Sequence, residues 1–343
     1  MNNNKLFDFD RKGHPAILAA IYGVAMLSPV AGYSAADNDT LTITGTEANN
    51  QGYSAGTSSV ASKAPTARIN EAQSVSVVTQ QQLDDYQVTS LTDAMRFVSG
   101  VSEGNTLAGT EDGFVRRGFG SNSDGSIYRD GVRSSQGLNF DATTERVEVL
   151  KGSASLLYGI QNPGGVINIV SKKPQYDWHT KVSGRYASEG GGAGTVDVTG
   201  PLGNGFAFRM IAEKQDQDYW RNFGSDKHTL IAPSLQWYGE KASFLISYSD
   251  YQYDIPYDRG TAFINGKPID IGYKDRLDDK SNRAWGHNKT LNAHYDWQFS
   301  HEWSTRLTLG WNQRRYNNDE VRVTAVNNTT GAVTRRADAN RGF

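Results

Sequence analysis

The chain has 343 residues, a formal net charge of −2 and no cysteine. This length is sufficient for two domains, and the near-neutral charge gives no indication of nucleic-acid binding. The absence of cysteine excludes disulfides, zinc–thiolate sites and iron–sulfur clusters. The six histidines are scattered without HxH or HxxxH spacing, so we expect no metal site built by the protein.

Residues 1–36 have the pattern of a secretory signal peptide. The segment begins with a basic stretch formed by Lys5, Arg11 and Lys12. An apolar run over residues 16–30 follows, and small residues at 34–36 then offer a cleavage site. The alternative is a membrane anchor, but the apolar run is shorter than the roughly 20 residues that a helical span needs. We therefore predict export and cleavage near Ala36, which suits the bacterial envelope.

A short strand-like segment follows the predicted cleavage site. It consists of Asp39, Thr40, Leu41, Thr42, Ile43 and Thr44, in which Thr alternates with Leu and Ile. Residues 49–62 are rich in Gly, Ser, Asn and Ala, which is typical of a flexible linker. A short strand on such a linker cannot fold alone, so we expect it to pair with the sheet edge of a partner. The alternative is a disordered tail without a function.

The next region, residues 65–177, has the pattern of an α+β domain. Residues 74–79 read as a strand, and Thr79 then caps a helix over residues 80–86, with Gln82 at the capping-box position. A second helix is predicted over residues 91–98 and ends at Gly100. Its apolar residues recur at helical spacing and predict a buried face, formed by Leu91, Ala94, Met95 and Val98.

Further strands are predicted at residues 114–119 and in a hairpin at residues 127–133, with Asp130 and Gly131 at the turn. Residues 145–174 then contain two apolar runs that are rich in Val and Ile, at 147–150 and 166–170. A short helical turn and a glycine corner separate the runs. By pattern alone, a generic βαβ unit has much the same sequence features, so it remains an alternative for residues 145–174.

The motifs ERVEVLKG, LYG, PGGVIN and SKKP within residues 145–174 resemble the plug domain of TonB-dependent siderophore receptors of the Gram-negative outer membrane. Residues 114–119 resemble the FxxRGF strand of that family, and residues 127–133 resemble its YxDGV segment. Ser153 and Asn162 depart from the family pattern, and we expect neither to alter the fold. The resemblance implies an α+β plug domain followed by antiparallel transmembrane β-barrel strands. It also implies that residues 39–44 are the TonB box, through which TonB, working with ExbB and ExbD, engages the receptor.

The resemblance assigns two sets of site residues. Charged residues of the plug are predicted to dock against the barrel wall, because charges inside the lumen need partners there; these are Arg117, Glu145, Arg146 and Glu148. Without the family, plain solvated charge is the simpler interpretation. Polar plug loops are predicted to contact the ferric siderophore, a transported ligand and not a cofactor, through Asn122, Gln136, Leu138, Asn139 and Phe140. The alternative is that these loops are ordinary surface turns.

The region 178–343 has the alternation of barrel strands. From Leu291 to Phe299, apolar and polar residues alternate, and the pattern resumes from Trp303 to Trp311 after a short turn. These runs are about as long as the 9–11 residues that membrane strands need. Residues 206–212, 229–237 and 242–248 alternate as well. Short turns alternate with longer polar connections, of which 254–283 is the longest, as in outer-membrane barrels.

Seven or eight strands are predicted, whereas the family has a barrel of about 22, and residues 336–342 show no strand alternation. We therefore expect the N-terminal part of a receptor, an incomplete 22-strand barrel that does not transport by itself, and a monomer in outer-membrane lipid. The alternative function is a secreted β-rich carbohydrate-binding or enzymatic module, with a groove lined by Trp220, Trp237 and Trp285. No GxSxG or HExxH motif supports catalysis. The class of siderophore, and any role in phage or colicin docking, stay open.

Overall fold

The computed structural model describes residues 52–120, 124–300, 302–327 and 329–338. The predicted signal peptide and TonB box, and also Asn122, lie outside the described residues. In the part that is described, no helix has the length and apolar character needed to cross a membrane. The two largest sheets of the described residues have five and eight strands.

The five-stranded sheet belongs to the N-terminal α+β region and has the order β3-β8-β9-β6-β7. Its strands are β3 (Ser74–Val78), β6 (Ile127–Arg129), β7 (Val132–Arg133), β8 (Thr144–Lys151) and β9 (Val166–Ser171). β8 and β9 pair antiparallel, and the short helix α4 (Ser155–Tyr158) lies between them in the chain. The βαβ interpretation is therefore wrong, because a βαβ unit requires parallel strands. The predicted turn between β6 and β7 is confirmed, since Asp130 and Gly131 both have positive φ.

The predicted helices are present, with one correction. α2 (Gln80–Asp85) has the expected capping box between Thr79 and Gln82. α3 (Leu91–Met95) is capped by Ser90 but ends three residues earlier than predicted. The amides of residues 96–98 bond to carbonyls three residues back, so the last turn is a tighter one. The predicted apolar face is nevertheless buried.

One strand of this region is also shorter than predicted. β5 (Phe114–Arg116) pairs with β4 (Val101–Glu103) and stops at Arg116. Arg117 and Gly118 have φ of 48° and 82°, which turns the chain back so that Arg116 bridges to Phe119. The remaining short elements are β1 (Thr57–Ser58), β2 (Thr66–Ala67) and the 3₁₀ helix η2 (Arg68–Asn70). The prediction of a flexible linker over residues 49–62 is wrong for residues 55–60, because β1 pairs with β2 and Val60 is fully buried in a core cluster of the α+β region.

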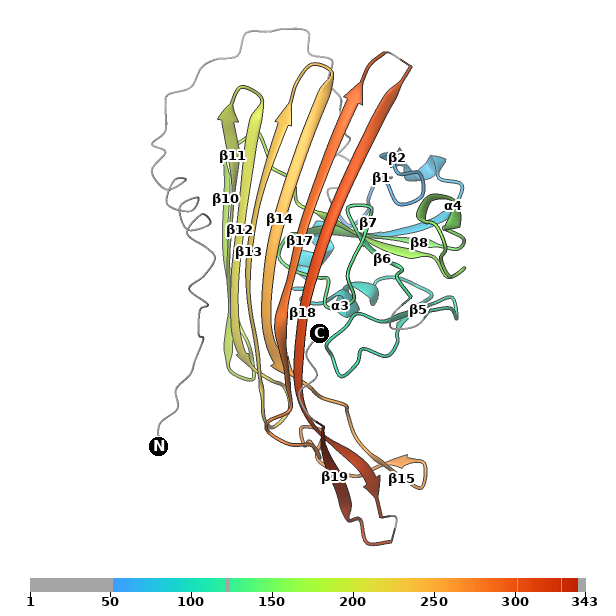
Figure 1. Ribbon diagram of the computed structural model, residues 1–343, viewed down its shortest axis with the longest axis vertical. Coiled ribbons are helices and arrows are strands. Elements are labelled where there is room, and N and C mark those ends of the chain that lie inside the picture. The colour runs from blue at the N-terminus through green and yellow to red at the C-terminus, as the bar shows by residue number, and fades with distance from the viewer. Residues whose placement is uncertain (1–51, 121–123, 301, 328, 339–343) are drawn as a thin grey trace. The chain divides into compact units, whose positions relative to one another are not determined.

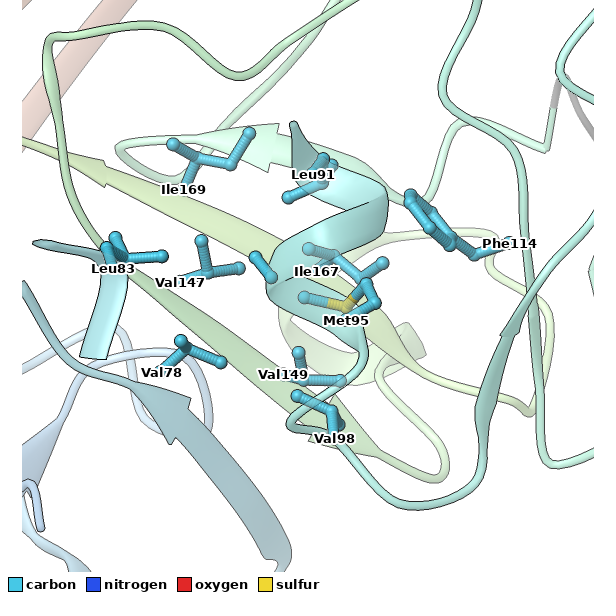
Figure 2. Packing of buried hydrophobic residues seen from close by; sticks show 11 residues of the cluster. Val78, Leu83, Leu91, Met95, Val98, Phe114, Val147, Val149, Ile167 and Ile169 are labelled. Atoms are coloured by element: carbon cyan, nitrogen blue, oxygen red, sulfur yellow. The ribbon is translucent and has the colours of Figure 1, made fainter. Parts of the chain in front are cut away.

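The core of the α+β region lies between its helices and one face of the sheet. Figure 2 shows Leu91 and Met95 of α3 facing Val147, Val149 and Ile167 of β8 and β9. Eleven buried residues form this cluster: Val78, Leu83, Leu91, Ala94, Met95, Val98, Phe114, Val147, Val149, Ile167 and Ile169. Complete burial of each large side chain contributes about 1.5–3 kcal/mol, so this cluster holds the helices on the sheet.

The second sheet is an antiparallel meander of eight strands in chain order (Figure 1). Its strands are β10 (His179–Tyr186), β11 (Gly191–Gly203), β12 (Phe206–Asp218), β13 (Ser225–Tyr238), β14 (Ala242–Pro256), β17 (Arg283–Gln298), β18 (Ser304–Val326) and β19 (Val333–Asp338). A small hairpin, β15 (Phe263–Ile264) and β16 (Lys267–Pro268), lies between β14 and β17 in the chain. The predicted number of strands is confirmed for the described residues.

Several strands are longer than their alternation predicts. β12 and β14 continue for several residues past the predicted end, and β13 begins four residues before the predicted start. The backbone pairing continues where the side-chain alternation weakens. β19 reaches Asp338 and pairs with β18, so the expectation that residue 336 begins a stretch without strand structure is wrong. An alternation test detects a strand with one apolar face, and here both faces are polar.

The hairpin of β17 and β18 turns its apolar face outward. Leu291 pairs with Trp311 and Tyr295 with Leu307, and the side chains of all four are between 36% and 54% exposed. The opposite face carries buried polar residues such as Asn288 and Asn292. No other sheet covers the apolar face among the described residues. A soluble sandwich would bury this face, whereas a membrane barrel exposes it to lipid.

The two ends of this sheet differ in their connections. The β11–β12, β13–β14 and β17–β18 connections are short, and we call this the short-turn end. The β10–β11, β12–β13 and β14–β17 connections lie at the opposite end, which we call the long-loop end because it carries the 26-residue connection between Pro256 and Arg283.

Candidate functional site

Hydrogen bonds connect two loops of the α+β region, residues 104–113 and 134–141, which together we call the plug apex. Asp112 joins them, because its Oδ2 accepts hydrogen bonds from the backbone N of Asn139 at 2.7 Å and from Asn139 Nδ2 at 3.2 Å. The amide of Asp112 also donates to the carbonyl of Gly137 at 3.0 Å. The apex therefore has a defined conformation.

The predicted ligand-contacting residues take different positions in this apex. Gln136 donates a hydrogen bond to Glu111. Leu138 packs against the cluster of Tyr253, Ile255 and Tyr257 at the long-loop end, and Phe140 packs against the core of the α+β region. Asn139 anchors the loop to Asp112. A role in ligand contact stays a prediction for all of them.

The predicted docking residues form a cluster within the α+β region. The carboxylate of Glu148 is fully buried and accepts from the N and Oγ of Ser59, both at 3.1 Å, and from Arg146 Nε at 2.9 Å. Arg146 also pairs with Glu145 at 2.6 Å, and Arg117 is exposed at its turn. These pairs tie the segment around Ser59 to β8. Docking against the barrel wall stays a prediction for these four residues.

Other residues, which the sequence did not single out for this role, join the α+β region to the eight-stranded sheet. Three ion pairs do so: Lys181 with Asp84 at 2.7 Å, Lys172 with Asp197 at 3.4 Å and Arg314 with Glu111 at 3.0 Å. Hydrogen bonds from strand side chains to carbonyls add to them, among them Arg209 to Lys173 at 2.9 Å and Asn288 to Leu138 at 3.3 Å. The sign of these contacts in the sequence was the set of polar residues that alternate with apolar ones along the strands. This set predicts a polar face of the sheet, but it does not identify the plug residues that pair with it.

A cavity of about 530 Å³ lies where the plug apex meets the long-loop end. We call it the mouth cavity. Glu103, Thr106, Ala108 and Gly109 line it from the α+β region. The β12–β13 and β14–β17 connections line the rest, chiefly through Tyr219, Trp220, Arg221, Asp258, Ile269, Ile271 and Tyr273. Its size and its mixture of aromatic and polar groups are those of a small-molecule site.

Ion pairs and hydrogen bonds hold the polar wall of the mouth cavity. Arg221 Nη1 lies 3.0 Å from both carboxylate oxygens of Asp258, and the Tyr219 hydroxyl donates to Asp258 Oδ2 at 3.1 Å. Burial, and next the negative charge of Asp258, raises the pKa of Tyr219 to about 12, so the phenol stays protonated. Trp220 and Tyr273 are 48% and 78% exposed and present their rings.

A second cavity, of about 540 Å³, lies between the α+β region and the inner face of the sheet. Polar residues line much of it, including Asp84, Arg185, Glu213 and His228. Glu213 and His228 are 2.8 Å apart. Within the described ranges, no group of three or more His, Asp or Glu side chains is placed to hold a metal ion.

The buried carboxyl of Asp112 makes the stability of the plug apex depend on pH. Burial raises its pKa from 3.8 to about 6, although hydrogen bonds from Asn139 and the charge of Arg129 oppose the shift and Glu111 adds to it. A raised pKa in the folded state means that protonation favours folding. The apex should therefore lose about 2–3 kcal/mol of local stability as the pH rises from below 4 to above 6.

Amide hydrogen exchange of residues 104–113 and 134–141 between pH 4 and 8 measures this effect. Asp112→Asn keeps an oxygen acceptor for Asn139 but cannot titrate, so it is the matched control. The free energy of opening of the natural apex, minus that of the variant, should fall as the pH rises from 4 to 8. A difference that stays constant or grows with pH would contradict the assignment.

The comparisons with known proteins agree with this architecture. Residues 67–166 match the family described as TonB-dependent Receptor Plug Domain. A ferrioxamine receptor from Yersinia enterocolitica is 31% identical over 324 residues, which cover 85% of this chain and 43% of the relative. A metal-pseudopaline receptor from Pseudomonas aeruginosa is 32% identical over 286 residues, which cover 80% of this chain and 40% of the relative. The chain thus spans about two fifths of the length of these curated relatives.

Solved structures show the same fold. The ferripyoverdine receptor of the Pseudomonas aeruginosa outer membrane superposes with a TM-score of 0.75 at 21% identity, covering 83% of this chain and 40% of the receptor. A siderophore receptor from Acinetobacter baumannii superposes with a TM-score of 0.70 at 26% identity, covering 80% of this chain and 40% of the receptor. The predicted fold, a plug domain with antiparallel barrel strands, is confirmed. The chain belongs to the TonB-dependent siderophore receptor family.

Proposed function

We propose that this chain acts in the uptake of ferric siderophores across the outer membrane of a Gram-negative bacterium. The observation that carries the proposal is the mouth cavity, because a plug apex and the loops of barrel strands line it together. The mouth cavity binds the ferric siderophore, which is cargo and not a cofactor. The long-loop end faces the exterior, and the short-turn end faces the periplasm.

In this proposal the chain has four parts. Residues 1–36 are a signal peptide cleaved near Ala36, and residues 37–64 hold the TonB box and the segment that leads from it into the plug. Residues 65–177 are the plug, and residues 178–343 are barrel strands. The match to the plug family at residues 67–166 and the start of the meander at His179 support the last two boundaries. The barrel acts as a monomer in outer-membrane lipid.

The transport step uses mechanical work and no covalent chemistry. TonB, driven by ExbB and ExbD, pairs with residues 39–44 as an added strand. A pull on this segment passes along the linker to the plug sheet. In the described residues, Ser59 bonds to Glu148 of β8, so the segment that enters the plug is attached to the central part of its sheet. The receptor relatives support this coupling.

Growth on purified siderophores tests the proposal. A receptor-null strain that carries the natural gene should grow under iron limitation on at least one ferric siderophore of a panel, and the receptor should sediment with the outer membrane. Growth on no ferric siderophore, or a protein that stays in the soluble periplasmic fraction, would contradict the proposal. The second outcome would favour a secreted carbohydrate-binding module.

Leu41→Pro tests the coupling segment. Proline donates no backbone hydrogen bond and disfavours pairing as a central strand, so uptake should fall to the background of the null strain. Binding of the ferric siderophore to whole cells should change by less than about twofold, because the TonB box is remote in sequence from the mouth cavity. Leu41→Val, which keeps strand propensity, is the control. Undiminished uptake by Leu41→Pro would refute the role of this segment.

A further inference from the structure

The described part of the mouth cavity contains no basic side chain that is available to an anionic ligand. Its charged lining residues are Glu103, Arg221 and Asp258. The Arg221 side chain is 7% exposed, pairs with Asp258 through Nη1, and donates from Nη2 to the carbonyl of Asp275. Glu103 is exposed and forms no ion pair with any described residue. Two acidic residues and one basic residue leave the lining with one net negative charge.

Three cations next to this lining are paired as well. One of them, Arg259, pairs with Glu320. The Arg276 side chain is 1% exposed and pairs with Asp278, and its Nε lies 4.0 Å from Asp258. Lys274, next to Tyr273 of the lining, pairs with Glu189 at 2.5 Å. Each of these positive charges already has a carboxylate partner, so a ligand would have to displace that partner to use it. Among the charged residues that line the described part of the mouth cavity, Glu103 is the one without an ion-pair partner.

Ferric siderophores differ widely in charge. A ferric tris-catecholate is a trianion, whereas ferric trihydroxamates are neutral or carry the charge of their end groups. An anion that leaves water for this cavity loses hydration without gaining a free cation, and it meets the like charge of Glu103. A cationic complex instead gains the attraction of that carboxylate. The rings of Trp220 and Tyr273 are exposed, but Arg221 and Lys274 already lie over them, at 5.5 and 5.8 Å from the ring centroids.

We propose that the mouth cavity selects ferric complexes without net negative charge, such as neutral or cationic hydroxamates, over anionic catecholates. This inference rests on the proposed function and adds a substrate class to it. Glu103 is then a specificity-determining residue, placed at the end of β4 where the chain enters the plug apex.

A charge series of one chelate tests the inference without a change of shape. The probes are a linear ferric trihydroxamate with a free terminal amine, its N-acetylated neutral form and its N-succinylated anionic form. Binding to the product of the natural gene in outer-membrane vesicles is measured by the quenching of tryptophan fluorescence. Affinity should fall by at least about tenfold from the cationic to the anionic form, and a trianionic ferric tris-catecholate should bind more weakly than all three.

Glu103→Lys should reverse this order of affinities or make the affinities equal. For Glu103→Gln, the ratio of the affinities for the cationic and the anionic form should lie between the ratios of Glu103→Lys and the natural chain. Glu240→Lys makes the same change of net charge in the exposed β13–β14 connection at the short-turn end, so it should leave the order unchanged. An increased affinity of Glu103→Lys for the anionic form also shows that the variant is folded.

The outcomes separate the two proposals. Equal affinities across the series, or an order that rises toward the anionic form, would overturn the charge selection and leave the proposed function intact. The same holds if Glu240→Lys shifts the order as much as Glu103→Lys does, since the effect would then be one of overall charge. Binding of none of the complexes by folded protein in the vesicles would overturn the proposed function and the selection with it.

Discussion

Replacing Gly165 by alanine is expected to disrupt the plug sheet. Gly165 has φ of +108°, and a Cβ at this position would lie 1.8 Å from the carbonyl oxygen of Leu150. That oxygen belongs to β8, which pairs with β9 directly after the glycine corner. A side chain therefore forces β8 and β9 apart, and we expect a loss of more than about 4 kcal/mol of local stability. Hydrogen exchange of peptides that cover β8 and β9 measures it.

Gly159→Ala is the matched control for this prediction. Gly159 has φ of +73°, similar in sign, but a Cβ added there would have no neighbouring heavy atom within 4 Å. Only backbone strain remains: φ of 73° and ψ of −153° lie in a region that is essentially confined to glycine, and a residue held there costs about 1–3 kcal/mol. If the two variants exchange at the same rate in β8 and β9, steric conflict with Leu150 is not what makes Gly165 necessary.

The fold was predictable largely where a local pattern decides the structure. The capping box of Thr79 and Gln82 and the turn at Asp130 and Gly131 depend on neighbouring residues, and both are present. The hairpin of β17 and β18 was predictable because its alternation is nearly complete and one face is apolar. What failed were element ends: α3 ends early through three-residue hydrogen bonds, and β5 ends where Arg117 adopts a positive φ. Tertiary context sets such ends.

The candidate site was less predictable, because its contacts join distant positions. Glu111 pairs with Arg314, 203 positions further along the chain, and neither residue has a local signature. Glu148 carries a family motif but is satisfied by Ser59 and Arg146. Asn162, a departure from the family pattern, donates to Asp124 at 3.2 Å. The polar face of a strand thus predicts that partners are needed but does not identify them.

The ion pair of Glu111 and Arg314 is expected to hold the plug apex against the wall. Its side chains are 4% and 16% exposed, and Arg314 belongs to β18. Glu111 also accepts from Gln136, so it joins both loops of the apex to that strand. Glu111→Gln leaves the guanidinium of Arg314 poorly compensated away from water. We expect a loss of about 2–3 kcal/mol in the attachment of the apex, since Arg314 retains some access to solvent.

Hydrogen exchange of residues 104–113 and 134–141 measures this loss, and two controls give it meaning. Glu111→Gln combined with Arg314→Met removes both charges, so much of the stability should return. Asp84→Asn breaks a different ion pair between plug and sheet, whose side chains are 49% and 43% exposed; exposed pairs contribute about 0–1 kcal/mol.

If Asp84→Asn loosens the apex as much as Glu111→Gln does, burial is not what gives the Glu111 pair its strength. If the double variant is no more stable than Glu111→Gln, the uncompensated charge of Arg314 is not the cause of the loss. In the proposed transport step, a plug that moves away from the wall has to break this buried pair. The pair therefore adds to the free energy that the proposed pull by TonB must supply.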